Sequence, residues 1–212
     1  MAIIHVEIKG TYALLQSRFG ATAEAGLIEE TRTIKKKALT PREEAEESCY
    51  RAKDGSLYHP ASAILSALCE AGSEFKQKGS RKNLKFLIPA AVRLMDDVIP
   101  LLDLAGKPLK DFDIDARRVV NKSTKGAHIC HRARIENWLS RFELKIFDDV
   151  IDPDTVHTLL SRAGERVGIG AFRPVPSKGP FGVFMVTKWA EAKPTTNGRV
   201  SSSLRVPELA GK

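Results

Sequence analysis

The order in which strands and helices alternate along the sequence constrains this fold more than any other feature. Near the N-terminus every second residue is apolar, and this period of two predicts a half-buried strand over residues 2–8. A stripe of apolar residues at helical spacing then predicts a helix over 60–75. Apolar runs over 87–94 and 98–102 predict further strands. The first half of the chain therefore has the order strand, helix, strand.

The same order returns near the C-terminus. Apolar and charged residues alternate from Trp138 to Phe147, which predicts a strand. A helix capped by aspartates follows over 153–164, and a last strand over 181–189. Two such units form the split βαβ of the ferredoxin-like fold, in which two helices cover one face of an antiparallel sheet. We therefore expect an α+β protein of this class.

The length of 212 residues suits one domain with an insertion. We expect the domain to cover 1–190 and the insertion to cover about 103–135, with strands over 117–121 and 127–135 inside it. Residues 191–212 contain few apolar side chains and are expected to form a flexible tail.

Composition excludes several classes of protein. No apolar stretch approaches the roughly 20 residues that a membrane helix needs, and the N-terminus lacks the pattern of a signal peptide. Cys49, Cys69 and Cys130 show no CxxC spacing, which argues against a disulfide framework or a zinc cluster. We expect a cytoplasmic protein with no membrane contact, no cofactor and no metal.

Positive charge is unevenly distributed along the chain. There are 34 Lys and Arg residues against 26 acidic residues, a net charge of +8. Two stretches contain no acid and hold spaced cations of the kind that a phosphate backbone requires. They comprise Lys76, Lys78, Arg81, Lys82 and Lys85 in the first stretch, and Arg117, Arg118, Lys122, Lys125, Arg132 and Arg134 in the second. The alternative is an ordinary solvated surface.

A glycine-rich segment lies between the last predicted helix and the last predicted strand. Its candidate ligand contacts are Gly168, Gly170, Arg173, Lys178 and Gly179. Glycines let a backbone approach an anionic ligand closely, but they also serve tight turns, and the sequence leaves both interpretations open. The segment matches neither a complete dinucleotide fingerprint nor a phosphate-binding P-loop.

Aromatic and titratable side chains offer further candidates. Base stacking or core packing would suit four rings, Tyr50, Tyr58, Phe172 and Phe181. Acid–base chemistry near neutral pH would fall to a histidine, among His5, His59, His128, His131 and His157. On a strand, His128 and His131 point to opposite faces, which is poor geometry for a shared metal.

Several features together resemble a known family. They are the first strand leading into Leu14 and Leu15, the Asp54-Gly55 turn before a long helix, the basic insertion, and the late helix followed by GIGAFRP and KGPFG. This pattern resembles the repeat-associated mysterious protein (RAMP) superfamily, and within it the backbone subunit of class 1 CRISPR effector complexes in a compact, phage-type form.

That resemblance implies a modified ferredoxin-like (RRM-like) fold. It also implies a subunit that binds single-stranded guide RNA through its phosphates and polymerises along it. An inserted hairpin reaches the neighbouring subunit in that family, and residues 117–134 would correspond to it here.

The sequence thus predicts a non-enzymatic protein that binds single-stranded RNA or DNA, RNA in the first place. It is expected to assemble head to tail along the strand, as a homo-oligomer or in a multi-subunit ribonucleoprotein, in a CRISPR-type complex or as a phage relative. One alternative is a metal-independent RNA endonuclease of the same superfamily that uses His5, His128 or His131. Another is a phage protein that acts by protein–protein contact on a host complex.

Overall fold

A four-stranded antiparallel sheet forms the centre of the protein, as the computed structural model shows for residues 1–18, 39–77, 79–120 and 126–192. Its strand order is β4-β8-β1-β9, and every neighbouring pair is antiparallel. The strands are β1 (Ala2–Gly10), β4 (Val92–Leu94), β8 (Leu139–Ile146) and β9 (Phe184–Glu191). The alternation in β1 buries Ile4, Val6 and Ile8, as its period of two predicts.

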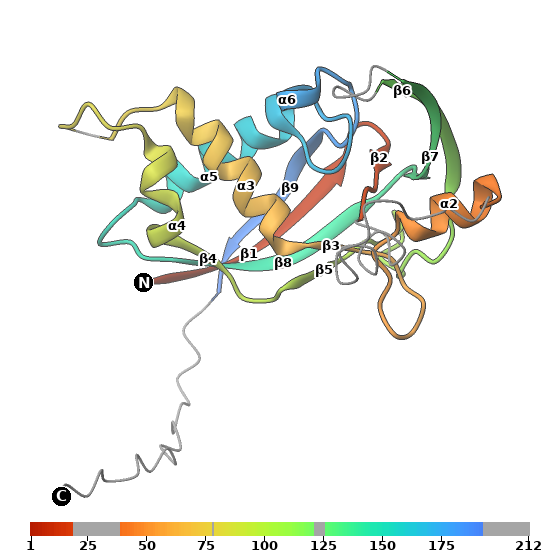
Figure 1. The fold of residues 1–212 in the computed structure, drawn as a ribbon. Helices are drawn as coiled ribbons and strands as arrows, with labels where there is room; N and C mark the ends of the chain where they lie inside the picture. Colours follow the sequence, from red (N-terminus) through yellow and green to blue (C-terminus); the bar gives the residue numbers. More distant parts are fainter. Residues whose placement is uncertain (19–38, 78, 121–125, 193–212) are drawn as a thin grey trace, which may run out of the picture.

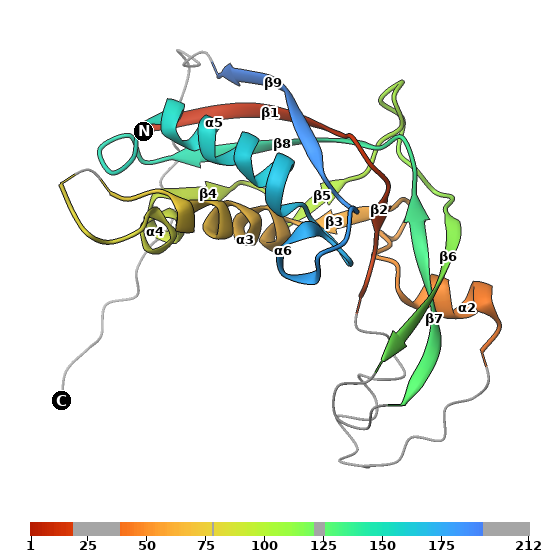
Figure 2. The same ribbon diagram turned by 90° about the horizontal axis from the view of Figure 1, so that it is seen from above.

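Two helices cover one face of this sheet (Figures 1 and 2). They are α3 (Ala61–Ala71) and α5 (Pro153–Arg162). Helix α5 begins at Asp152, whose side chain accepts a hydrogen bond from the Thr155 backbone N–H, and it buries Val156, Leu159 and Leu160. It continues directly into a π-helical turn over Ala163–Val167.

Along the chain, the strands of this sheet and the two helices that cover it follow in the order β1, α3, β4, β8, α5, β9. Since β1 lies between β8 and β9 in the sheet, the two strand–helix–strand units interleave. This arrangement of mixed α and β elements is consistent with the ferredoxin-like fold that the order of predicted elements indicates.

A second sheet extends beyond one end of the first (Figure 2). It contains β2 (Leu14–Leu15), β6 (Asp113–Val120) and β7 (Ala127–Ile135) in the order β2-β7-β6. Helix α2 (Pro41–Glu47) lies beside this hairpin, and Thr40 and Glu43 form the capping box at its start. A small antiparallel pair is formed by β3 (Tyr58–Pro60) and β5 (Val98–Pro100), and β3 leads directly into the start of α3.

Some predicted boundaries were wrong. Half of the predicted strand over 87–94 is helical, because α4 spans Ile88–Ala91 and only β4 is extended. A short apolar run does not distinguish strand from buried helix, and Pro89 in the first turn of α4 favours the helix. Helix α3 ends at Ala71 and passes into a 3-10 turn over Gly72–Glu74.

Other boundaries moved because of contacts made far along the chain. The last strand begins at Phe184 because Gly182 folds back, with its N–H donating to the Ala13 carbonyl at 2.8 Å. The hairpin of the predicted insertion occupies 113–135. Strand β9 includes Glu191, and the rest of the predicted tail from 193 on lies outside the described residues. In the described ranges, no helix has the length and apolar character needed to span a bilayer.

Candidate nucleic-acid interface

The base of the β6–β7 hairpin lies against the glycine-rich segment. The Arg117 guanidinium lies 4.4 Å from the centre of the Phe181 ring, and that of Arg132 lies 4.9 Å from the centre of the Phe172 ring. Arg134 also approaches Phe181, at 6.0 Å. Tertiary structure therefore brings together two regions that the sequence singles out separately. Phe181 is only 1% exposed, so it serves packing rather than base stacking.

Acidic residues from outside the acid-free stretch neutralise part of the hairpin charge. Arg117 makes a two-pronged contact with Asp115, with Nε donating at 2.6 Å and Nη2 at 3.0 Å. Nδ1 of His131 lies 2.6 Å from a carboxylate oxygen of Glu44 on α2. A further pair joins Arg134 to Glu136, with Nε donating at 2.8 Å. Arg118 remains exposed, whereas Lys122 and Lys125 lie outside the described residues.

The glycines of the segment shape the loop. Gly168 and Gly170 have φ values of +71° and +79°, a region that side chains with a Cβ disfavour. A Cβ at Gly170 would lie 2.5 Å from the Leu15 carbonyl oxygen, which also accepts the Ala171 N–H at 2.8 Å. Backbone N–H groups at Gly168 and Gly179 donate within the protein, to Ala163 and Arg173. The turn role of these glycines is thus visible, and their ligand contact stays a prediction.

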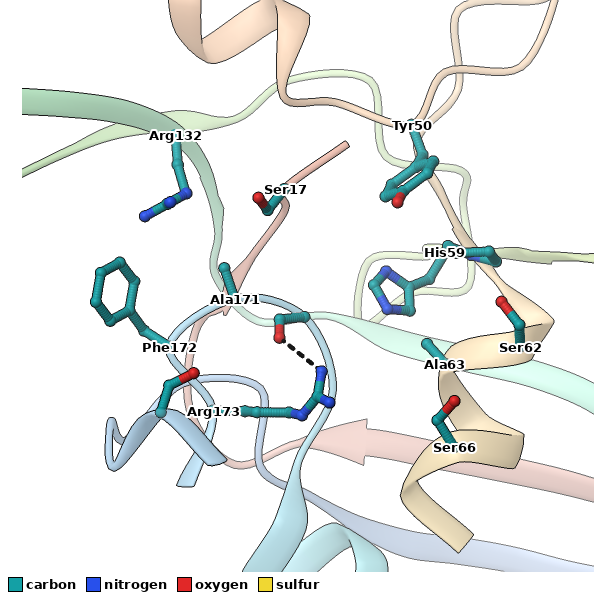
Figure 3. A pocket seen from close by; sticks show the side chains of 13 residues that line it. Ser17, Tyr50, His59, Ser62, Ala63, Ser66, Arg132, Ala171, Phe172 and Arg173 are labelled. Atoms are coloured by element: carbon teal, nitrogen blue, oxygen red, sulfur yellow. Dashed lines mark hydrogen bonds between the residues drawn. The ribbon is translucent and has the colours of Figure 1, made fainter. Parts of the chain in front are cut away.

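A pocket of about 470 Å³ opens between this loop and the start of α3 (Figure 3). Figure 3 shows Ala171, Phe172 and Arg173 on one side and Tyr50, His59, Ser62 and Ser66 on the other. Among the described residues, the lining comprises Ser17, Tyr50, His59, Pro60, Ser62, Ala63, Ser66, Arg132, Gly170, Ala171, Phe172, Arg173 and Ser177. The described part of this lining includes two arginines and no acid, so its electrostatic potential favours an anion.

The two pocket arginines are held differently. Arg173 is fixed by its own loop, because Nε donates to the Val175 carbonyl at 2.8 Å and Nη1 to the Gly170 carbonyl at 3.2 Å. Arg132 stacks on Phe172, and its buried Nη1 has no hydrogen-bond partner among the described residues. A guanidinium donates in several directions, so both side chains keep donor capacity for a ligand oxygen.

His59 is the most unusual side chain of the pocket. It is 4% exposed, and in the part of the chain that the structure describes neither ring nitrogen has a hydrogen-bond partner. Burial, together with the nearby Arg173 charge, lowers the pKa of His59 from 6.5 to about 4. The ring is therefore neutral at physiological pH and offers one donor and one acceptor.

The buried side-chain amide of Gln16 holds together the two backbone segments that form the pocket wall beside His59. Gln16 is fully buried, its Nε2 donates to the Tyr58 carbonyl at 2.6 Å, and its Oε1 accepts the Tyr50 backbone N–H at 2.9 Å. The Tyr50 ring in turn lies 5.9 Å from the His59 ring, edge to face. Sequence reasoning did not identify Gln16 or Ser17. The four-residue spacing of Ser62 and Ser66 places both on one face of a helix, and it was the one sequence signal for the part of the pocket wall that α3 forms.

The other basic stretch lies elsewhere. Residues 76–85 follow the C-terminal end of α3, at the opposite end of the molecule from the hairpin (Figures 1 and 2). Lys85 pairs with Glu70 at 3.5 Å. Lys76, Arg81 and Lys82 are exposed, and Lys78 lies outside the described residues. The two predicted basic regions therefore do not form one continuous patch.

The three histidines considered for catalysis are not brought together. His5 lies on the open face of the sheet, where Nδ1 is 3.0 Å from a Glu143 carboxylate oxygen. His128 is exposed on the hairpin, and His131 faces Glu44 on the other side of the same strand. Within the described ranges, no group of three or more His, Cys, Asp or Glu side chains is placed to hold a metal ion.

Comparison with known proteins identifies similarity at the level of the fold. No family model matches the sequence, and no curated protein matches it. Among solved structures, 34 chains match. One belongs to the "Cryo-EM structure of the Type III-B Cmr-beta bound to cognate target RNA", with a TM-score of 0.51 and 16% sequence identity. The match covers 91% of the present chain and 61% of that chain, so the present chain spans less than two thirds of its length.

Proposed function

We propose that this protein binds single-stranded nucleic acid, with RNA as the expected form, and that it does so without catalysis. The observation that carries the proposal is the acid-free pocket between the glycine-rich loop and α3, with Arg132 and Arg173 in its walls. Arginine side chains bind phosphate oxygens well, and a pocket without carboxylates does not repel a polyanion. The fold similarity to a chain of a structure described as bound to cognate target RNA supports the same ligand class.

The location of the proposed interface follows from a contrast between two faces. The open face of the sheet, which many small RNA-binding domains use, is here crossed by ion pairs such as Arg141 with Glu7 at 2.7 Å. Its central strands β1 and β8 present no aromatic platform there, since alternate positions are charged or polar. We therefore propose that the bound nucleic acid runs along the pocket side of the protein, past the exposed Lys178.

The proposal includes the finer features that the resemblance implies. Residues 1–190 form one RAMP-like domain in which the hairpin is an insertion. Copies assemble head to tail along the strand, as in the backbone of a CRISPR-type effector. The hairpin reaches past the end of the main sheet (Figure 2), and this extension supports the proposal that it contacts a neighbouring copy.

Salt-dependent binding tests the core of this proposal. Affinity for a labelled single strand of about 12 nucleotides should fall linearly with the logarithm of salt concentration. Lys178→Ala should reduce the slope by about 0.7, because it removes one phosphate contact. Lys9→Ala, on the open face of the sheet, is the matched control and should leave the slope unchanged. A wild-type protein that binds no strand at low salt would refute the proposal.

Assembly is tested separately by light scattering after size-exclusion chromatography. The mass of the complex should grow in steps with strand length, and the protein alone should remain small. Oligomers of one size with and without nucleic acid would favour the alternative of a protein that acts by protein–protein contact. Discrete RNA products formed in the presence of EDTA would instead favour the endonuclease.

A further inference from the structure

The pocket contains two chemically different sets of polar groups. Arg132 and Arg173 only donate hydrogen bonds, which suits phosphate oxygens. The hydroxyls of Ser62 and Ser66 both donate and accept, and so does the neutral ring of His59. A ligand that suits both sets presents an anionic group beside a group that both donates and accepts hydrogen bonds, as a hydroxyl does.

The start of α3 strengthens this assignment. Its N-cap is Pro60, so no side chain caps the helix, and Pro60, Ser62 and Ala63 all line the pocket. The N-terminal end of an eleven-residue helix carries partial positive charge, which favours a nearby phosphate. His59, immediately before this end, is buried with both nitrogens unpartnered among the described residues. A buried polar ring without partners is costly, and a ligand hydroxyl would supply the missing hydrogen bond.

We propose that this pocket holds one ribonucleotide of the bound strand and distinguishes RNA from DNA by its 2′-hydroxyl group. The phosphate lies towards Arg132 and Arg173, and the ribose lies against Ser62, Ser66 and His59. The ring nitrogens of His59 are covered in the free protein, so a neighbouring pocket side chain turns aside when the ribose enters. This inference rests on the proposed function and names the class of strand that it selects.

The chemistry of the 2′-hydroxyl favours it as the group that is recognised. A hydroxyl both donates and accepts, and it is the one group that separates the backbone of RNA from that of DNA. Deoxyribose would place a C–H group against the serine hydroxyls and the imidazole and would leave them unpaired. Sites built to hydrogen-bond a hydroxyl discriminate strongly against the analogue that lacks it.

The experiment compares RNA and DNA strands of identical sequence, about 12 nucleotides long and containing only adenine and cytosine, so that they differ only in the 2′-hydroxyl. Affinities are measured by fluorescence anisotropy at one salt concentration. Wild-type protein should bind RNA at least about tenfold more tightly than DNA. The double variant Ser62→Ala/Ser66→Ala should lower RNA affinity towards the DNA value and leave DNA affinity unchanged.

Two further variants separate folding from recognition. Ser161→Ala, at a serine on α5 outside the pocket, is the matched control and should retain the RNA preference. His59→Phe keeps a buried ring but removes both nitrogens, and it should also reduce the preference. The serine variants keep the result interpretable if His59→Phe folds poorly, because alanine is a good helix former at exposed helix positions.

The possible failures are distinguishable. Equal, salt-dependent affinity of the wild-type protein for both strands would overturn the ribose assignment and leave the proposed function standing. Equal loss of RNA and DNA affinity in the serine variant would also overturn it, because the serines would then act on a feature common to both strands. Absence of binding to either strand would overturn the proposed function and this inference together.

Discussion

At the scale of single residues, His59 shows how burial alters a side chain that sequence reasoning treats as one of five equivalent histidines. Its neighbours along the chain, Tyr58 and Pro60, give no sign of burial. The β3–β5 pairing places His59 opposite Ile99, which is buried, and Tyr50 packs against the ring from another segment. Its depressed pKa is therefore a product of tertiary packing.

The buried histidine predicts acid-sensitive stability. In the unfolded chain the imidazole binds a proton as the pH falls below about 6.5, whereas the folded protein resists protonation until a pH of about 4. Stability from this group is complete above pH 6.5 and is lost as the pH falls through this window. Between pH 7 and pH 4.5, His59→Phe should therefore lose about 2 to 3 kcal/mol less unfolding free energy than the wild type, measured with urea.

The comparison between the two proteins removes the contribution of other groups that titrate in this range. Carboxylates with lowered pKa, such as Glu7 beside Arg141 and Glu46 beside Arg51, are present in both proteins and affect them equally. Identical losses of stability in wild type and variant would contradict this prediction, because they would show that the folded protein binds a proton at His59 as readily as the unfolded chain does.

At the scale of elements, the glycine-rich loop depends on a close approach that only its partner β2 explains. Gly170 has a positive φ, and its Cα faces the Leu15 carbonyl. Gly55 has nearly the same φ, +81°, but no atom lies within 4 Å of a Cβ built there. The two positions therefore share a backbone conformation that would strain any residue with a Cβ, and they differ in how crowded that Cβ would be.

Alanine substitution at these two glycines should separate the two effects. Gly55→Ala should cost about 1 to 2 kcal/mol of unfolding free energy, from left-handed strain alone. Gly170→Ala should cost clearly more, because the new methyl group meets backbone rather than a flexible side chain. Chemical denaturation measures both. A cost at Gly170 no larger than that at Gly55 would mean that the loop moves away from β2 without penalty.

At the scale of the whole molecule, the two basic regions lie at opposite ends of α3. An eleven-residue helix is about 16 Å long, so only a nucleic-acid strand that spans more than this distance reaches from the pocket to the basic residues beyond α3. The charge that the sequence presents as two similar stretches is therefore divided in space between one region beside the pocket and another beyond α3.

The length of the bound nucleic acid should therefore decide which cationic side chains contribute to its binding. Arg81→Ala/Lys82→Ala should reduce the salt slope by about 1.4 for a strand of about 20 nucleotides, because two phosphate contacts are lost. The same variant should bind a strand of about 3 nucleotides as the wild type does, because such a strand is too short to span α3. The double variant Lys9→Ala/Lys188→Ala, on the open sheet, is the control for loss of charge. An equal effect at both lengths would contradict the separation of the two ends.

Much of the fold could be predicted because its signals are local. Alternation in β1 and β8 and the capping aspartate of α5 depend on nearby residues, and the structure has these elements where the patterns place them. The run from 87 to 94 failed because its apolar residues suit a strand and a buried helix equally, and proline decided between them.

The sequence alone determined the order of strands and helices, the hairpin and the regions that carry excess charge, because these follow from periodicity and composition. Tertiary structure alone decided which of these regions meet. It placed Arg132 from the hairpin, Arg173 from the glycine-rich loop and His59 before α3 around one pocket. Residues so far apart in the chain leave no shared local pattern, since their proximity arises only when distant strands pair and helices pack on the sheet.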